Sequence, residues 1–84
     1  GSVMGDENQR PMTLGERRVV LSFNPSKDQR VDDVKRKVAA LIDDMEALKR
    51  DAAPGSEQGR WCSLAQTHFE DAAMYAVKAV TARY

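Results

Sequence analysis

A proline–glycine pair at residues 54 and 55 separates two long amphipathic segments, and this division constrains the fold more than any other feature. Proline and glycine are the residues that most often interrupt a helix and begin a turn. The segment before the pair, residues 26–50, repeats apolar side chains at a helical spacing of about 100° per residue. These side chains are Val31, Val34, Val38, Leu41, Ile42, Met45 and Leu48. They cover an arc of roughly 120°, which suits packing against one partner.

The segment after the pair, residues 56–82, is apolar over about half of its helical circumference, although one partner helix needs a stripe of only ~100°. The residues on this arc are Trp61, Leu64, Ala65, His68, Phe69, Ala72, Ala73, Tyr75, Ala76, Ala79 and Val80. Another chain or the N-terminal arm must therefore cover the surplus, and the alanines indicate close helix–helix approach. Because exposed apolar area of this extent marks an interaction surface, we expect a homo-oligomer.

Two helices of about 24 residues would each be about 36 Å long, and a short connection makes them antiparallel neighbours. The predicted fold class is therefore all-α, an antiparallel two-helix hairpin with a short N-terminal arm that assembles into a helical homo-oligomer. Residues 1–11 show no periodicity and are predicted to form a flexible tail, which includes Gly1-Ser2 as an expression scar. Residues 12–84 are predicted to form a single helical-hairpin domain.

The arm between residues 13 and 23 admits two interpretations. Thr13 and Glu16 have the spacing of a capping box, which would open a short helix. The alternative is an extended arm, which we favour because residues 19–23 contain β-branched and aromatic side chains. Asn24 precedes a proline, so the helix is not expected to include it. Ser26, three residues before a glutamine, is the predicted N-cap of the first long helix, and Ser56 that of the second.

Composition excludes several classes of function. Thirteen basic and thirteen acidic residues balance, which argues against a protein that coats DNA or RNA. One cysteine and one histidine build neither a disulfide framework nor a metal site. No apolar run approaches the ~20 residues that span a bilayer, and no signal peptide is recognisable, so the cytosol is the default compartment. Phosphate-binding loops and catalytic motifs are absent from the sequence, so we expect neither an enzyme nor a cofactor.

A polar strip follows the edge of the apolar arc in the second segment. It consists of Arg60, Thr67, Asp71, Met74 and Lys78, whose spacings of seven, four, three and four place them on one helical face. Two cations and a hydroxyl could bind a phosphodiester, because arginine can donate two parallel hydrogen bonds to it. The pattern alone favours the simpler interpretation of a solvated helix edge.

Four single residues are ambiguous. His68 lies within the apolar arc, which predicts a buried or interfacial histidine rather than a catalytic one. Cys62 is on the apolar side as well, so an inert buried thiol is expected. Lys35 borders the apolar face of the first helix, where a lysine usually extends its ammonium into water. Phe23 could either fill the core or present a platform on which a base stacks.

Two stretches resemble a known family. Residues 23–43 read FNPSKDQRVDDVKRKVAALID, and residues 60–81 read RWCSLAQTHFEDAAMYAVKAVT. Both are similar to segments of the helical-hairpin domain shared by phage anti-CBASS sponges and the hairpin part of phage anti-Thoeris sponges. The resemblance covers residues 12–82, and the second stretch is the more specific one.

This resemblance implies a phage protein that acts in the host bacterial cytosol and sequesters cyclic oligonucleotide immune signals without cleaving them. Anti-CBASS members are homohexamers, built as trimers of dimers, that hold cyclic dinucleotides between protomers; some hold cyclic trinucleotides at separate sites. Anti-Thoeris members bind cyclic ADP-ribose isomers and typically carry a β-rich region ahead of the hairpin. Because little sequence precedes the hairpin here, the compact anti-CBASS type is expected.

The resemblance also implies site residues. Phe23 and Lys35 match the aromatic and the lysine that line the dinucleotide pocket, although the usual aromatic is a tyrosine. Arg60 and Thr67 match residues of the trinucleotide site, and Lys78 joins them through the polar strip. Two alternatives stay open: a sponge for cyclic ADP-ribose signals, and a helical-hairpin oligomerisation or interaction module without a nucleotide ligand.

Overall fold

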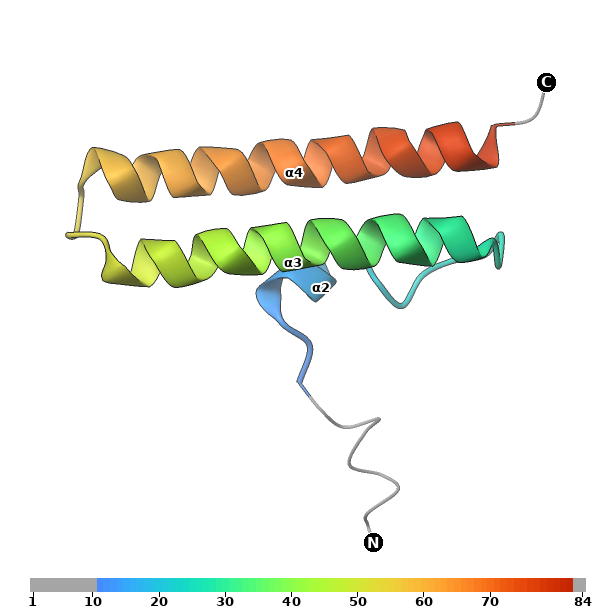
Figure 1. Cartoon of the computed structure of the whole chain (residues 1–84), viewed down its shortest axis with the longest axis horizontal. Coiled ribbons are helices and arrows are strands. Elements are labelled where there is room, and N and C mark those ends of the chain that lie inside the picture. Colours follow the sequence, from blue (N-terminus) through green and yellow to red (C-terminus); the bar gives the residue numbers. More distant parts are fainter. Residues whose placement is uncertain (1–10, 83–84) are drawn as a thin grey trace, which may run out of the picture.

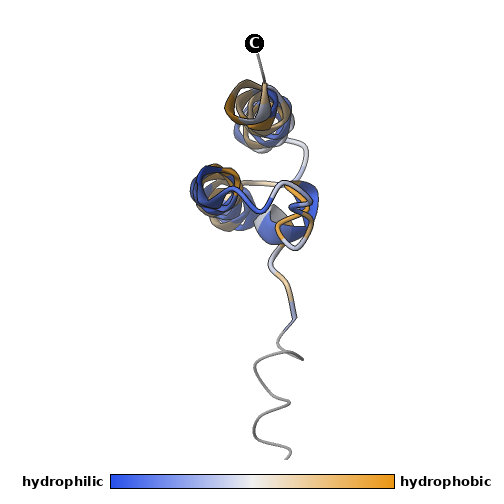
Figure 2. Cartoon of the chain, turned by 90° about the vertical axis from the view of Figure 1, so that its right-hand side faces the viewer, coloured by the Kyte–Doolittle hydropathy of each residue, from blue (hydrophilic) through white to orange (hydrophobic). Residues whose placement is uncertain are grey.

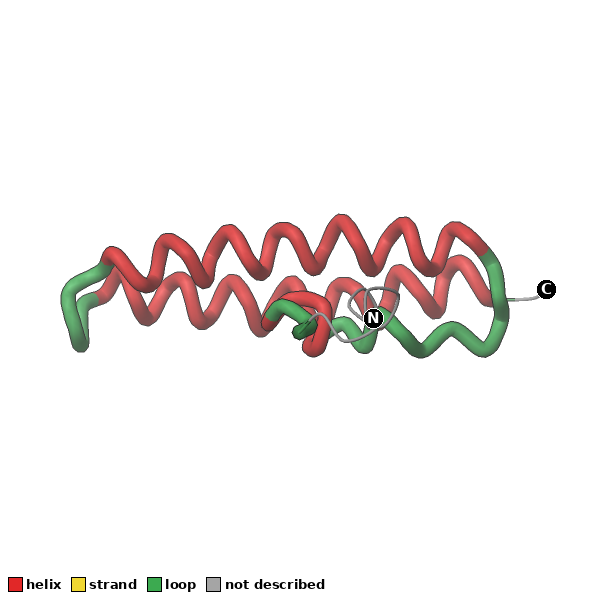
Figure 3. The backbone as a smooth tube through the Cα atoms, turned by 90° about the horizontal axis from the view of Figure 1, so that it is seen from below, coloured by secondary structure: helices red, strands yellow, loops and turns green. Residues whose placement is uncertain are grey.

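The computed structural model describes residues 11–82, which form the helices α2 (Leu14–Arg18), α3 (Gln29–Asp51) and α4 (Glu57–Thr81). α3 and α4 run antiparallel and side by side, joined by the predicted turn (Figures 1 and 3), and α2 packs on α3. The described residues contain no strand, so the prediction of an all-α fold class is confirmed for them. The predicted tail, apart from Pro11, and the last two residues of the predicted domain lie outside the described residues.

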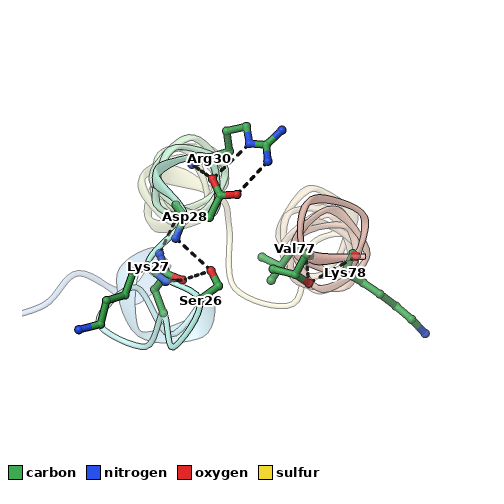
Figure 4. Close-up of polar contacts among 8 residues, drawn as sticks. Ser26, Lys27, Asp28, Arg30, Val77 and Lys78 are labelled. Atoms are coloured by element: carbon green, nitrogen blue, oxygen red, sulfur yellow. Dashed lines mark hydrogen bonds and ion pairs between the residues drawn. The ribbon is translucent and has the colours of Figure 1, made fainter. Parts of the chain in front are cut away.

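The two long helices begin differently from each other. Ser56 is the N-cap of α4, as predicted, and its hydroxyl accepts a hydrogen bond from the Gly59 amide at 3.2 Å. The prediction that Ser26 caps α3 is wrong, because Lys27 has a φ of 58°, which no α-helix accommodates. The N-cap is Asp28, whose carboxylate accepts from the Arg30 amide at 2.9 Å. Ser26 instead accepts a hydrogen bond from the Asp28 amide (Figure 4).

The N-terminal arm is partly helical, so the favoured extended interpretation is wrong. Thr13 and Glu16 form the alternative capping box, in which each side chain accepts a hydrogen bond from the other residue's amide at 3.0 Å. A five-residue helix is unstable alone and needs tertiary contacts. Gly15 supplies them: its amide donates to Asp43 at 2.8 Å, and a Cβ at this position would lie 2.0 Å from the Ala39 carbonyl oxygen.

The core lies between the three helices. Viewed along the long helices, α4, α3 and the N-terminal segment occupy the corners of a triangle (Figure 2). Ile42 is completely buried at its centre. Val19, Ala39 and Ala73 join it, with Leu14, Leu21, Val38 and Phe69 packed around them.

A buried glutamine also connects the two long helices. Gln66 is 1% exposed, and its amide nitrogen donates to the Ile42 carbonyl and to the Glu46 carboxylate, both at 3.1 Å. The hydrogen bond from Gln66 is the main reason why the pKa of Glu46 is lowered. Cys62 is buried nearby as a free thiol, as predicted.

The surplus apolar residues of α4 lie on its outer side, where the rest of the described chain does not cover them. The helix buries Cys62, Gln66 and Ala73. Trp61 and Tyr75 remain 56% and 71% exposed in the single chain, and His68 is exposed too. The arm therefore does not cover this side of α4, and His68 is not buried within one chain. None of the helices among residues 11–82 is both long and apolar enough to cross a membrane.

Candidate functional site

A buried lysine organises the turn that follows α2. Lys35 is only 6% exposed, and its ammonium donates hydrogen bonds to the Val20 carbonyl at 2.9 Å and to the Phe23 carbonyl. The Phe23 amide donates to the Val20 carbonyl at 3.0 Å and closes the turn. The expectation that Lys35 extends its ammonium into water is therefore wrong. The two carbonyl oxygens replace water around the charge, which makes burial of the ammonium tolerable.

Val20 adopts a conformation that is unusual for its residue type. Its φ is 54°, in the left-handed region, where a β-branched residue is a genuine outlier. The conformation costs ~1–2 kcal/mol, and such strain persists only where surrounding contacts impose it. The hydrogen bonds that Lys35 makes on either side of this turn are contacts of that kind.

Phe23 is 62% exposed, so the interpretation of this residue as a core plug is wrong. The Lys35 ammonium lies 5.8 Å from the centroid of its ring, within the range of a cation–π interaction. The structure thus brings together Phe23 and Lys35, the two residues predicted for the dinucleotide pocket. An exposed ring beside a cation is a suitable platform for stacking a nucleobase.

Two cavities flank this pair. The first has a volume of about 340 Å³ and the second about 270 Å³. Both are lined by Phe23, Lys35 and Val77. The first is also lined by Arg18, Val19, Val20, Glu70, Ala73 and Met74, and the second by Asn24, Pro25, Ser26, Val31 and Thr81. Together they form an apolar groove, bounded by the arm and α4, with a few polar groups. We call it the arm groove.

An ion pair that the sequence analysis missed lies at the first cavity. The Arg18 guanidinium donates to Glu70 Oε1 from Nη2 at 2.7 Å and from Nε at 3.3 Å. The two side chains are 26% and 35% exposed. They belong to α2 and α4 and are separated by 52 positions, and no local pattern in the sequence relates residues so far apart.

The other predicted site residues lie elsewhere. Arg60, Thr67 and Lys78 are exposed along α4, and neither Arg60 nor Lys78 forms an ion pair with any residue among 11–82. The Thr67 hydroxyl donates to the Ser63 carbonyl of its own helix at 3.2 Å. Eighteen positions separate the two cations, a distance of roughly 27 Å along a helix. Figure 4 shows Lys78 extending away from the turn that carries Ser26. One chain therefore does not gather these residues into a single site.

Arg60 instead lines a cavity of about 400 Å³ at the hairpin turn, together with Lys49 and the turn at residues 52–57. Lys49 lies 3.6 Å from the Glu46 carboxylate and donates to the Ser63 hydroxyl at 3.2 Å. This cavity contains none of the other predicted site residues. Within residues 11–82, no group of three or more potential ligand side chains could hold a metal ion.

Comparison with known proteins identifies the family. The sequence model of the family described as "Acb2/Tad1, hairpin domain" matches residues 16–81, which include α3, α4 and most of the arm. No curated protein and no solved structure gave a match. The matched span contains the arm groove and most of the chain. The protein therefore belongs to the Acb2/Tad1 hairpin-domain family, the anti-CBASS and anti-Thoeris sponges for cyclic nucleotide signals.

Proposed function

We propose that this protein is a phage-type sponge that binds cyclic dinucleotides in the arm groove and sequesters them, without cleavage, in the host bacterial cytosol. The observation that carries the proposal is the pairing of Phe23 with Lys35 between two cavities. A cyclic dinucleotide has two bases and two phosphates, and the groove offers an aromatic face, a cation and apolar walls. Family membership supports binding rather than catalysis.

The Lys35 ammonium can donate one further hydrogen bond in this groove. An ammonium has three N–H donors, and two of them are used by the carbonyls of Val20 and Phe23. The third is available for one phosphate oxygen of the ligand. Lys35 therefore contributes a single charge-assisted hydrogen bond, while Phe23 stacks on a base.

Self-association is the second part of the proposal. Leu41 and Leu48 of α3 and Trp61, Leu64 and Tyr75 of α4 are exposed in the single chain. Burying an exposed side chain of this size contributes ~1.5–3 kcal/mol, so contacts between copies would be strongly favourable. We propose a homo-oligomer, and a hexamer on the basis of the family resemblance.

The exposed strip on α4 suits a site completed by a neighbouring copy. Arg60 and Lys78 are unpaired cations within the described chain, and they lie too far apart to contact one small ligand together. We propose that the strip, including Thr67, binds cyclic trinucleotides in the assembled oligomer. Cyclic ADP-ribose isomers are the alternative ligands.

A competing function is a hairpin oligomerisation or interaction module without a nucleotide ligand, which the exposed apolar side of α4 favours. Thermal melting with cyclic dinucleotides, cyclic trinucleotides and cyclic ADP-ribose isomers separates the two functions. A ligand at 100 times its dissociation constant adds ~2.7 kcal/mol of stability. No stabilisation by any of them would support the interaction module. Chromatography of ligand released from heat-denatured complex should recover it intact, and linearised nucleotide would contradict the sponge.

A further inference from the structure

At the polar end of the first cavity, the Glu70 carboxylate is hydrogen-bonded to the described residues through only one of its two oxygens. Both hydrogen bonds from Arg18 go to the same oxygen of Glu70, Oε1. The other oxygen, Oε2, accepts no hydrogen bond from any residue among 11–82. In a two-pronged arginine–carboxylate pair both oxygens would be occupied. Here one oxygen is left as an acceptor on a side chain that Arg18 already orients.

We propose that Glu70 is a specificity-determining residue that selects guanine for the first cavity, and that Arg18 is its positioning residue. The proposal rests on the proposed function, because it concerns which base of a cyclic dinucleotide the arm groove accepts. The carboxylate of Glu70 accepts hydrogen bonds and cannot donate them. The Watson–Crick edge of guanine presents two adjacent donors, N1–H and the N2 amino group. The same edge of adenine presents one amino donor beside an unprotonated nitrogen, which accepts a hydrogen bond and offers the carboxylate no second donor.

The cavity places the required groups around one base. Phe23, Lys35 and Glu70 all line the same volume of about 340 Å³, with Val19, Ala73 and Met74 as apolar walls. The proposal places a base on the Phe23 ring in this cavity, with its edge toward Glu70 and its phosphate toward Lys35. The unused N–H groups of Arg18 can donate to guanine O6, since the ion pair employs only Nε and Nη2.

A preference for guanine follows because guanine and adenine form different numbers of hydrogen bonds with Glu70 and Arg18. Guanine can supply two donors, N1–H and N2–H, to the Glu70 carboxylate and an acceptor, O6, to Arg18. Adenine supplies only one donor and one acceptor, so its edge makes one charge-assisted hydrogen bond fewer with this pair. Sites built to hydrogen-bond a particular group discriminate strongly against analogues that lack it. We expect a preference of about tenfold or more, the factor that corresponds to one charge-assisted hydrogen bond.

Calorimetric titration of the full chain with cyclic di-GMP and cyclic di-AMP tests the inference. Wild type should bind cyclic di-GMP about tenfold more tightly or better. Glu70→Gln should remove most of this preference by weakening cyclic di-GMP binding, while the affinity for cyclic di-AMP changes little. The matched control is Asp44→Asn, which removes the same charge from an exposed position on α3, outside the residues that line the groove. It should leave both affinities unchanged.

The outcomes separate this inference from the proposed function. If wild type binds neither dinucleotide, the proposed function fails. If wild type binds both equally, or if Glu70→Gln weakens both equally, the sponge stands and the role of Glu70 is wrong. Circular dichroism verifies folding of the variants. Should Glu70→Gln unfold, Arg18→Gln provides the second test, because Glu70 then loses its orientation and the guanine preference should fall. An unchanged preference in Arg18→Gln would overturn the positioning role.

Discussion

Replacing Lys35 with methionine removes the ammonium that holds the turn after α2 and leaves an aliphatic side chain of similar length to fill its place. The carbonyls of Val20 and Phe23 lose their donor, and the left-handed conformation of Val20 loses the contacts that impose it. A hydrogen bond to a charged group contributes ~1.5–3 kcal/mol, and the relaxed turn recovers part of two such bonds from water. We expect Lys35→Met to lower the free energy of unfolding by about 2–3 kcal/mol.

For a domain of this size, that loss lowers the melting temperature by roughly 10–20 °C. Urea unfolding followed by circular dichroism measures the free energy, and calorimetry measures cyclic dinucleotide binding. Binding should weaken at least tenfold, since both the cation and the position of Phe23 are lost. The control is Lys37→Met, which removes an exposed lysine two positions along α3. If Lys35→Met is as stable as Lys37→Met, the ammonium does not organise the turn. If stability falls while affinity stays unchanged, Lys35 does not contact the ligand.

Four further predictions follow from individual contacts. Gly15→Ala should destabilise the protein by ~1–3 kcal/mol in urea titrations, because the added methyl group overlaps the backbone of α3; wild-type stability would show that α2 does not dock as described. Ala76→Glu should dissociate the proposed oligomer, which light scattering would detect as a mass approaching 9.4 kDa. An unchanged mass would place Ala76 outside any interface shared between copies. Thr67→Ala should weaken cyclic trinucleotide binding in calorimetry and spare cyclic dinucleotides; equal damage to both would refute separate sites. The hydrogen bond from Gln66 lowers the pKa of Glu46 in the folded state, so the stabilisation is present above the unfolded pKa of ~4.3 and is lost as the pH falls through the lowered value. The stability difference between wild type and Glu46→Gln should therefore shrink on acidification, and a pH-independent difference would contradict this linkage.

The sequence was sufficient to predict the elements that depend on local signals. The helical spacing of apolar residues, the break at residues 54–55 and the cap at Ser56 are all present in the structure. The start of α3 was misplaced by two residues because Ser26 and Asp28 are both good caps, and the positive φ of Lys27 decides between them. The short helix of the arm was missed because β-branched residues near its end favour extended backbone, whereas docking of Gly15 favours the helix.

The candidate site was predicted only in part. Phe23 and Lys35 were named through the family resemblance, and the structure brings them together. The two carbonyl partners of the lysine could not be foreseen, because they depend on how the arm turns. Arg18 and Glu70 meet only after three helices have packed. Helical spacing reports which residues share a face, and it carries no information about contacts across such distances along the chain.

The buried amide of Gln66 has a consequence for how the hairpin can be assembled. A shift of α4 along α3 by one turn, ~5.4 Å, is the nearest alternative register that keeps the same faces of the two helices together. Such a slip would separate the amide from both of its acceptors and leave it buried without partners, at a cost of ~1–3 kcal/mol. Gln66 thus opposes such a slip and favours the observed helical register. The same register sets how Trp61 and Tyr75 are aligned with Leu41 and Leu48, so a residue hidden inside one chain determines the apolar pattern that a second copy would have to match in the proposed oligomer.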